Sequence, residues 1–294
     1  MSKFRKIALS LGILLGLTAC QGANSNDPAS EKAADTNKDT QVEETSTEDT
    51  PRTLKLGVVG ERNEPWEEAI KKYEEDTNNK VEIVRFSDYN QPNDALKDKD
   101  IDLSSFATRI FIEDYNQNQN AGFHYIADTV ISPMGIYSSK LEDHKDIPEG
   151  GIVAIPVEVS NNSRALYILD AAGVIKVRED AGDFITLDDI EENPKNIEFV
   201  KLPADQVSRS LEDVDAALIN SDMAMEAGFI PTEDAIYLED PNHERSKNFI
   251  NVIAVKEEDK DDEDILDLVN NYFLTDETKE VYEREYKGSV ICMW

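Results

Sequence analysis

The chain has 294 residues, of which 62 are Asp or Glu and 30 are Lys or Arg, so its formal net charge is −32. Nucleic acid and anionic membrane surfaces would repel such a chain, and we exclude both as partners. Solubility alone explains the acidity. The length beyond the first segments allows one large domain or two smaller ones.

The N-terminal segment resembles a bacterial lipoprotein signal. A basic start precedes an apolar run, 7–17, that is too short to span a bilayer. The run ends in Leu-Thr-Ala-Cys, which resembles a lipobox, a signal that is cleaved before a cysteine that carries lipid. We therefore expect a signal peptide over 1–19 and lipidation of Cys20, with more than one acyl chain needed for a stable membrane anchor.

Residues 20–52 contain almost no apolar side chains. Such a segment cannot bury enough surface to fold, so we expect a disordered acidic tether. With Cys20 lipidated, Cys292 has no disulfide partner and is expected to be a packed thiol. The three histidines are far apart and lack metal-ligand spacing, so we expect no metal and no cofactor.

After the tether, strand and helix patterns alternate. The predicted elements are strands at 54–59, 81–86 and 101–106, and helices beginning at Pro65 and spanning 93–97 and 110–116. This βαβαβ order is typical of a parallel sheet covered by helices. Ligands of such sheets bind beyond the C-terminal ends of the strands.

Three aromatic side chains fall at or just after those strand ends, namely Phe86, Tyr89 and Phe106. Taken singly, each is more typical of a hydrophobic core. Three in equivalent places make a ligand pocket a competitive interpretation, and we keep all three as candidates.

A second alternation contains the most informative stretch, 153–173. A strand at 153–155 precedes a Ser-Asn-Asn turn of helix-capping types, and a helix follows with Arg164 in its first turn. A helix N-terminus favours an anion, and the guanidinium fork suits a carboxylate. We infer that a ligand carboxylate binds here; the alternative is that Arg164 is an ordinary surface arginine.

The later elements complete this second block and lead into the C-terminal tail. They are strands at 197–200, 216–219, 235–238 and 249–255, and helices at 208–211, 223–227, 265–272 and 277–286. Asn220 follows one of these strands and offers both donor and acceptor atoms. Asn is equally common in plain turns.

The two blocks predict two lobes. Residues 53–137 plus 233–294 would form lobe 1, and residues 138–232 would form lobe 2. A cleft between the lobes would have the apolar walls and few fixed polar groups of a small-ligand site. It would collect Tyr89, Phe106, Arg164 and Asn220.

No enzyme signature stands out. Residues 57–60 lack the further glycine or the Lys-Ser/Thr of a phosphate loop. The chain has no G-x-S-x-G elbow, and no histidine lies near a nucleophile in a recognisable pattern. A pair of carboxylates could meet by chance, but none is marked, so we expect no catalysis.

Ordered motifs across 53–294 carry a family resemblance. They are LGVVG, FSDYNQPN, PMGIYS, AIP, N-x-x-R, ENPKN, SRSL, VDAA, LIN and YKG. The chain resembles the NlpA-type lipoproteins, the methionine-binding components of ABC importers. The resemblance implies an α/β, two-lobed periplasmic-binding-protein fold, type II-like, with hinged lobes and a ligand cleft between them.

The resemblance also implies roles for individual residues. The arginine matching Arg164 holds the ligand's carboxylate, and the asparagine matching Asn220 bonds its amino-acid end. Side chains matching Tyr89 and Phe106 line the pocket, and Asn161 belongs to the same turn as Arg164.

The chain departs from the family's pattern in two places. The family's Phe-Gln-His is here Phe-Ala-Thr, so Thr108 replaces a ring donor. The family's Pro-Asn-Asp-Pro-Thr-Asn turn reads Pro-Val-Glu-Val-Ser-Asn over 156–161. Relatives that bind methionine-containing dipeptides are a precedent for altered specificity. Asp222 could face a ligand ammonium group, or it could cap the helix at 223–227.

We therefore expect a monomeric, lipid-anchored solute-binding protein on the extracellular face of a bacterial cell membrane. It would bind methionine or a related amino acid and deliver it to an ABC permease and its ATPase, which the resemblance alone implies. Alternatives are a binder of a methionine-containing dipeptide or another amino acid, or a surface interaction lipoprotein without small-ligand binding. The predicted ligand-binding residues are Arg164, Asn220, Tyr89, Phe106, Asn161, Thr108 and Phe86.

Overall fold

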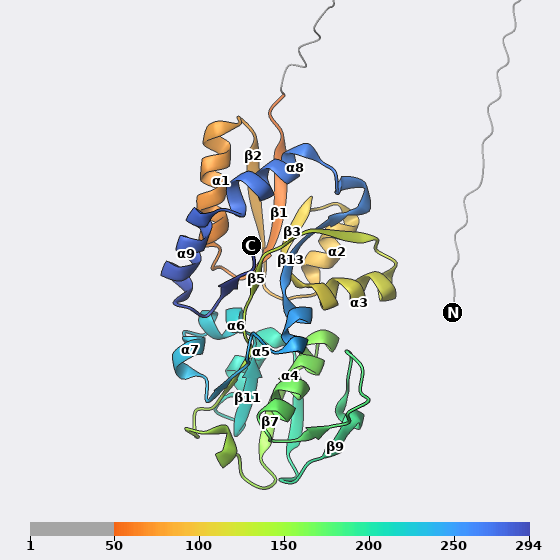
Figure 1. The fold of residues 1–294 in the computed structure, drawn as a ribbon, viewed down its shortest axis with the longest axis vertical. Helices are drawn as coiled ribbons and strands as arrows, with labels where there is room; N and C mark the ends of the chain where they lie inside the picture. Colours follow the sequence, from red (N-terminus) through yellow and green to blue (C-terminus); the bar gives the residue numbers. More distant parts are fainter. Residues whose placement is uncertain (1–49) are drawn as a thin grey trace, which may run out of the picture. The chain divides into compact units, whose positions relative to one another are not determined.

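The computed structural model describes residues 50–294 (Figure 1). The predicted signal peptide, Cys20 and the tether up to residue 49 lie outside the described residues. Within the described part, no helix is long and apolar enough to cross a bilayer. No group of His, Cys, Asp and Glu side chains in residues 50–294 is arranged to hold a metal ion.

The first sheet has five strands in the order β2-β1-β3-β13-β4. They are β1 (Thr53–Val59), β2 (Lys80–Phe86), β3 (Leu103–Thr108), β4 (Phe123–Asp128) and β13 (Asn251–Lys256). β1 pairs in parallel with β2 and β3, through the crossover helices α1 (Glu64–Asp76) and α2 (Gln91–Asp98). The predicted parallel βαβαβ unit is confirmed, and β13 adds antiparallel pairs to β3 and β4.

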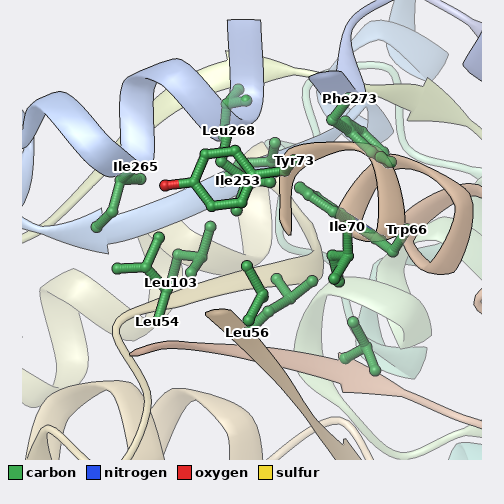
Figure 2. Close-up of a cluster of buried hydrophobic side chains, with 14 of the residues drawn as sticks. Leu54, Leu56, Trp66, Ile70, Tyr73, Leu103, Ile253, Ile265, Leu268 and Phe273 are labelled. Carbon is green, nitrogen blue, oxygen red and sulfur yellow. The ribbon is translucent and has the colours of Figure 1, made fainter. Parts of the chain in front are cut away.

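The core of the first sheet joins distant segments of the chain (Figure 2). Leu54 and Leu56 project from β1 onto the apolar face of α1, where Trp66 and Tyr73 are buried. Trp66 stacks on Phe273 with ring centroids 3.7 Å apart. Burial of one such large side chain contributes roughly 1.5–3 kcal/mol, so the C-terminal helices stabilise the first sheet.

The second sheet has five strands in the order β10-β7-β11-β6-β12. They are β6 (Gly135–Tyr137), β7 (Ile152–Pro156), β10 (Glu198–Leu202), β11 (Ala216–Ile219) and β12 (Tyr237–Leu238). β7 pairs in parallel with β10 and β11, whereas β6 is antiparallel to β11 and β12. The helices that follow its strands are α4 (Val159–Ala171), α5 (Ala204–Val207) and α6 (Ser221–Glu226).

Other elements flank the two sheets. They are α3 (Arg109–Gln119), β5 (Val130–Ile131), β8 (Lys176–Val177), β9 (Ile190–Glu192), α7 (Pro231–Asp234), α8 (Glu263–Asp267), a π-helix at Leu268–Phe273, α9 (Asp276–Tyr286) and β14 (Ile291–Cys292). Short 3₁₀ helices lie at 144–146, 187–189, 208–210, 244–249 and 257–259. β5 pairs with β14, which brings the C-terminal end of the chain to the middle of the described part.

The chain passes between the two sheets twice, over residues 129–134 and residues 239–250, which we call the crossing segments. The segments lie side by side, since the Glu239 N–H donates to the Met134 carbonyl at 3.0 Å and the Met134 N–H donates to Glu239 Oε2 at 3.0 Å. β6 and β12 pair in the second sheet although the predicted lobe 1 includes both. The lobe boundaries remain a prediction.

Candidate functional site

One cavity is lined by residues of both sheets, and the space in it that is open to the centre of a water molecule is about 120 Å³. Most of the predicted ligand-binding residues line it, namely Tyr89, Phe106, Thr108, Asn161, Arg164 and Asn220. Phe86 does not; it lines a neighbouring cavity together with Arg85 and Met223. Whether any of these residues binds a ligand remains a prediction.

The two sheets contribute different chemistry to the cavity. Phe106 and Thr108 lie on β3, and Tyr89 lies in the turn after β2. The rings of Tyr89 and Phe106 are stacked with centroids 6.2 Å apart and form an apolar wall. The second sheet supplies the polar side: Asn161 and Arg164 from α4, and Asn220 from the end of β11.

Arg164 is not a surface residue: 4 % of it is exposed, so the surface-arginine interpretation was wrong. Its Nε and Nη2 donate to Glu239 Oε2, at 3.0 and 2.6 Å. Nη2 also donates to the Ser132 carbonyl at 2.9 Å, and the guanidinium lies 4.6 Å from the centroid of the Phe249 ring. Within the part of the chain that the structure describes, Nη1 donates no hydrogen bond to protein, so this nitrogen can serve a ligand.

The helix that carries Arg164 begins earlier than its sequence predicts. Glu158 is the N-cap and Val159 the first helical residue, so Arg164 lies in the second turn. The side chains of the Ser-Asn-Asn residues do not cap the helix, since they follow its N-cap. Asn162 Nδ2 donates instead to the carbonyl of Pro156, at the end of β7, at 2.8 Å. Arg164 therefore acts through its own charge rather than through a capped helix end.

Asn220 and Asn161 form a polar pair beside Arg164. Nδ2 of Asn220 donates to Oδ1 of Asn161 at 3.0 Å. Oδ1 of Asn220 is buried and accepts no hydrogen bond from residues 50–294. A buried acceptor without a donor costs about 1–3 kcal/mol, which a ligand N–H could recover.

Asp222 faces the same cavity and is not a helix cap. Asn220 occupies the N-cap position of α6, which begins one residue before Asp222. The Tyr89 hydroxyl lies 2.6 and 2.7 Å from the two carboxylate oxygens of Asp222. Surrounding protein desolvates the carboxyl and raises its pKa, while the Tyr89 hydrogen bond and the Arg164 charge oppose the rise. Burial likewise raises the pKa of Tyr89.

Sequence reasoning missed several residues of this site. Glu239 was one acidic residue among 62, and nothing local marks it as the partner of Arg164. Arg62, Tyr282 and Tyr286 also line the cavity. The two tyrosines reach it because the C-terminal helix α9 packs against α1.

The cavity shows no arrangement of side chains that is typical of an activated nucleophile. Its described lining includes serines but no histidine, lysine or cysteine. A serine hydroxyl needs such a neighbour to become reactive. The arrangement is suited to holding a charged, partly apolar small molecule.

Comparisons with known proteins agree with this geometry. The profile of the NlpA lipoprotein family matches residues 54–294. Outer membrane lipoprotein 2 of Mannheimia haemolytica is 32% identical over 99% of each chain. The D-methionine-binding lipoprotein MetQ of Escherichia coli strain K12 is 32% identical over 83% of this chain and 89% of its own.

A solved structure supports the same likeness. A nutrient binding protein from Burkholderia cenocepacia, solved bound to methionine, is 36% identical and superposes with a TM-score of 0.78 over 82% of this chain and 100% of its own. The predicted two-lobed α/β fold class is therefore confirmed.

Proposed function

The chain belongs to the NlpA lipoprotein family, and from that premise we propose that it is a solute-binding lipoprotein that captures methionine, or a closely related amino acid, for an ABC importer. Two relatives support the choice of ligand: one is named a D-methionine-binding lipoprotein, and the other was solved with methionine bound. The function is capture and delivery without chemistry.

The observation that carries the proposal is the buried guanidinium of Arg164. Glu239 and Ser132 accept from Nε and Nη2, which leaves Nη1 without a hydrogen-bond partner among residues 50–294. Arg164 lines the cavity whose apolar wall includes Tyr89 and Phe106. A ligand carboxylate at Nη1 would gain a charge-assisted hydrogen bond of roughly 1.5–3 kcal/mol. The apolar wall suits a side chain such as that of methionine.

We further propose that lipid on Cys20 anchors the protein at the extracellular face of the cell membrane and that the protein works as a monomer. Closure of the two lobes about the crossing segments would enclose the ligand, and an ABC permease with its ATPase would receive it. Support for these proposals comes from the lipobox-like sequence, the relatives named as lipoproteins and the two-sheet fold.

Thermal unfolding of the purified full-length protein with a panel of amino acids and methionine-containing dipeptides tests the function. A specific ligand at about 100 times its Kd should stabilise the fold by roughly 2.7 kcal/mol. A shift with methionine supports the proposal. If only a dipeptide or another amino acid raises the unfolding temperature, that compound and not methionine is the ligand. If none of them raises it, small-molecule capture is overturned.

A matched pair of variants tests the role of Arg164. Replacing Arg164 alone would leave Glu239 buried without its counter-charge, so loss of binding could reflect misfolding. The double variant Arg164→Gln/Glu239→Gln removes both charges together, and Glu239→Gln alone retains the arginine. We expect the single variant to bind methionine and the double variant to fold but not bind. Equal binding by both would exclude Arg164 as the anchor.

A further inference from the structure

Asp222 is the only acidic residue among the described residues that line the cavity. Asp222 is an exposed residue, so a molecule in the cavity that it lines can reach its carboxylate. No lysine, arginine or histidine of residues 50–294 lies within ion-pair distance of it, and its side-chain partner is the neutral hydroxyl of Tyr89. The cavity thus presents a carboxylate that has no counter-ion from the described protein.

The acceptor capacity of this carboxylate is not used up. Two carboxylate oxygens offer about four lone-pair sites. The Tyr89 hydroxyl and the backbone N–H groups of Asp222 and Met223 donate to them, which accounts for three of the four. The neighbouring Asn220 adds a second acceptor, because its Oδ1 has no hydrogen-bond donor among residues 50–294 although Asn220 is only 8 % exposed. The remaining capacity of Asp222 and the unpaired Oδ1 of Asn220 fit a ligand group that carries several N–H bonds.

The opposite charge lies in the same cavity. Arg164 and Asp222 both line it and interact electrostatically, yet they do not form an ion pair with each other. Positive and negative side chains that share a cavity without touching match a zwitterion, whose carboxylate and ammonium groups would occupy the space between them.

We propose that Asp222 determines specificity by binding the positively charged amino group of the ligand, with Asn220 Oδ1 as a second acceptor, so that the ligand is held as a zwitterion between Asp222 and Arg164. This inference rests on the proposed function and refines it. The site takes ligands with a free amino group and discriminates against analogues that lack one.

Isothermal titration calorimetry on the purified full-length protein provides the test. The probes are methionine and 4-(methylthio)butanoate, which is methionine without its amino group. The variants are Asp222→Asn, which keeps the size of the side chain and an oxygen for the Tyr89 hydroxyl, and Asp213→Asn. Asp213 is an exposed acidic residue outside the cavity, so it controls for the loss of one negative charge.

We expect the wild type and Asp213→Asn to bind methionine at least about tenfold more tightly than the deaminated analogue, because a hydrogen bond between charged groups is worth that factor or more. Asp222→Asn should lose this preference through weaker methionine binding, while its thermal unfolding remains cooperative. If Asp222→Asn keeps the full preference, this inference is overturned and the proposed function stands. If the wild type binds no methionine, the proposed function is overturned, and the inference with it.

Discussion

Glu239 Oε2 accepts hydrogen bonds from both Nε and Nη2 of Arg164, although 75 residues separate the two in sequence. The pair is almost fully enclosed, with 4 % of Arg164 and 8 % of Glu239 exposed. Glu239 also accepts from the Met134 N–H at 3.0 Å and lies 3.3 Å from the Ser246 hydroxyl. These bonds fix the orientation of the guanidinium before any ligand arrives.

Breaking this ion pair should cost stability. Glu239→Ala leaves the Arg164 charge buried without its partner and should lower the free energy of unfolding by about 3–5 kcal/mol. Urea denaturation measures this loss. Glu239→Gln keeps an acceptor for the guanidinium and should cost less. If the alanine variant is no less stable than the glutamine variant, the pair does not hold Arg164.

The Tyr89–Asp222 hydrogen bond joins the two sheets, because Tyr89 follows β2 and Asp222 lies on α6. Tyr89→Phe should therefore favour a more open, ligand-free protein, seen as a larger radius of gyration in small-angle X-ray scattering. Tyr115→Phe is the control, since its hydroxyl bonds Asp94 within the part built on the first sheet. Equal radii for the two variants would contradict this role.

Asp222 should make ligand-free stability depend on pH. Desolvation by the protein around the cavity raises its folded-state pKa above the usual 3.8, so the folded protein holds the proton more tightly than the unfolded chain. The stability that Asp222 contributes is then full below about pH 3.8 and is lost as pH rises through the raised pKa. Thermal unfolding of wild type and Asp222→Asn from about pH 4 to about pH 7 should show the variant gaining relative stability. If the difference in stability between the two proteins does not change with pH, the pKa of Asp222 is not raised in the folded state.

Cys292 should resist alkylation in the folded protein. Burial raises the pKa of its thiol to about 11 from the usual 9.0. Only the thiolate reacts, so unfolding in urea should speed the reaction with iodoacetamide about 100-fold. Mass spectrometry of the peptide that contains Cys292 separates it from Cys20. Similar rates in the folded and unfolded chain would show an accessible, ordinary thiol.

A side chain at Gly60 should cost more stability than one at Gly122. Its φ is +80°, and an added Cβ would lie 1.9 Å from Glu226 Oε1, which accepts from the Glu61 N–H at 2.8 Å. Gly122 has a φ of +67° and nothing within 4 Å, so Gly122→Ala reports the backbone cost alone, about 1–2 kcal/mol. Gly60→Ala should lose more stability in urea denaturation than Gly122→Ala. Equal losses would mean that Glu226 moves aside freely.

Much of the fold follows from local patterns. Alternating or continuous apolar runs predicted β1, β2, β7 and β11 within a residue or two, because one or both faces of each strand are buried. The pairing of β6 and β12 could not be predicted, since strands of two or three residues carry no periodicity and depend on their neighbours.

The site was predictable where a residue follows a predicted strand and unpredictable where nothing in the local sequence marks it. Arg164 and Asn220 stand out by their place after strands, and both line the cavity. Glu239 follows a two-residue strand and looks like many other acidic residues. Phe86 ends its strand as predicted but lines the neighbouring cavity, because only the packed structure decides which side of the turn after β2 each ring occupies.

Arg164 is fastened to both crossing segments, through the Ser132 carbonyl in one and Glu239 in the other. Any rotation of one sheet relative to the other must be accommodated by a change in the backbone of these same segments. Separation of the two sheets would therefore weaken the proposed contact between Arg164 and the carboxylate of a bound ligand. Release of the ligand would then need neither a competing solute nor a change of pH.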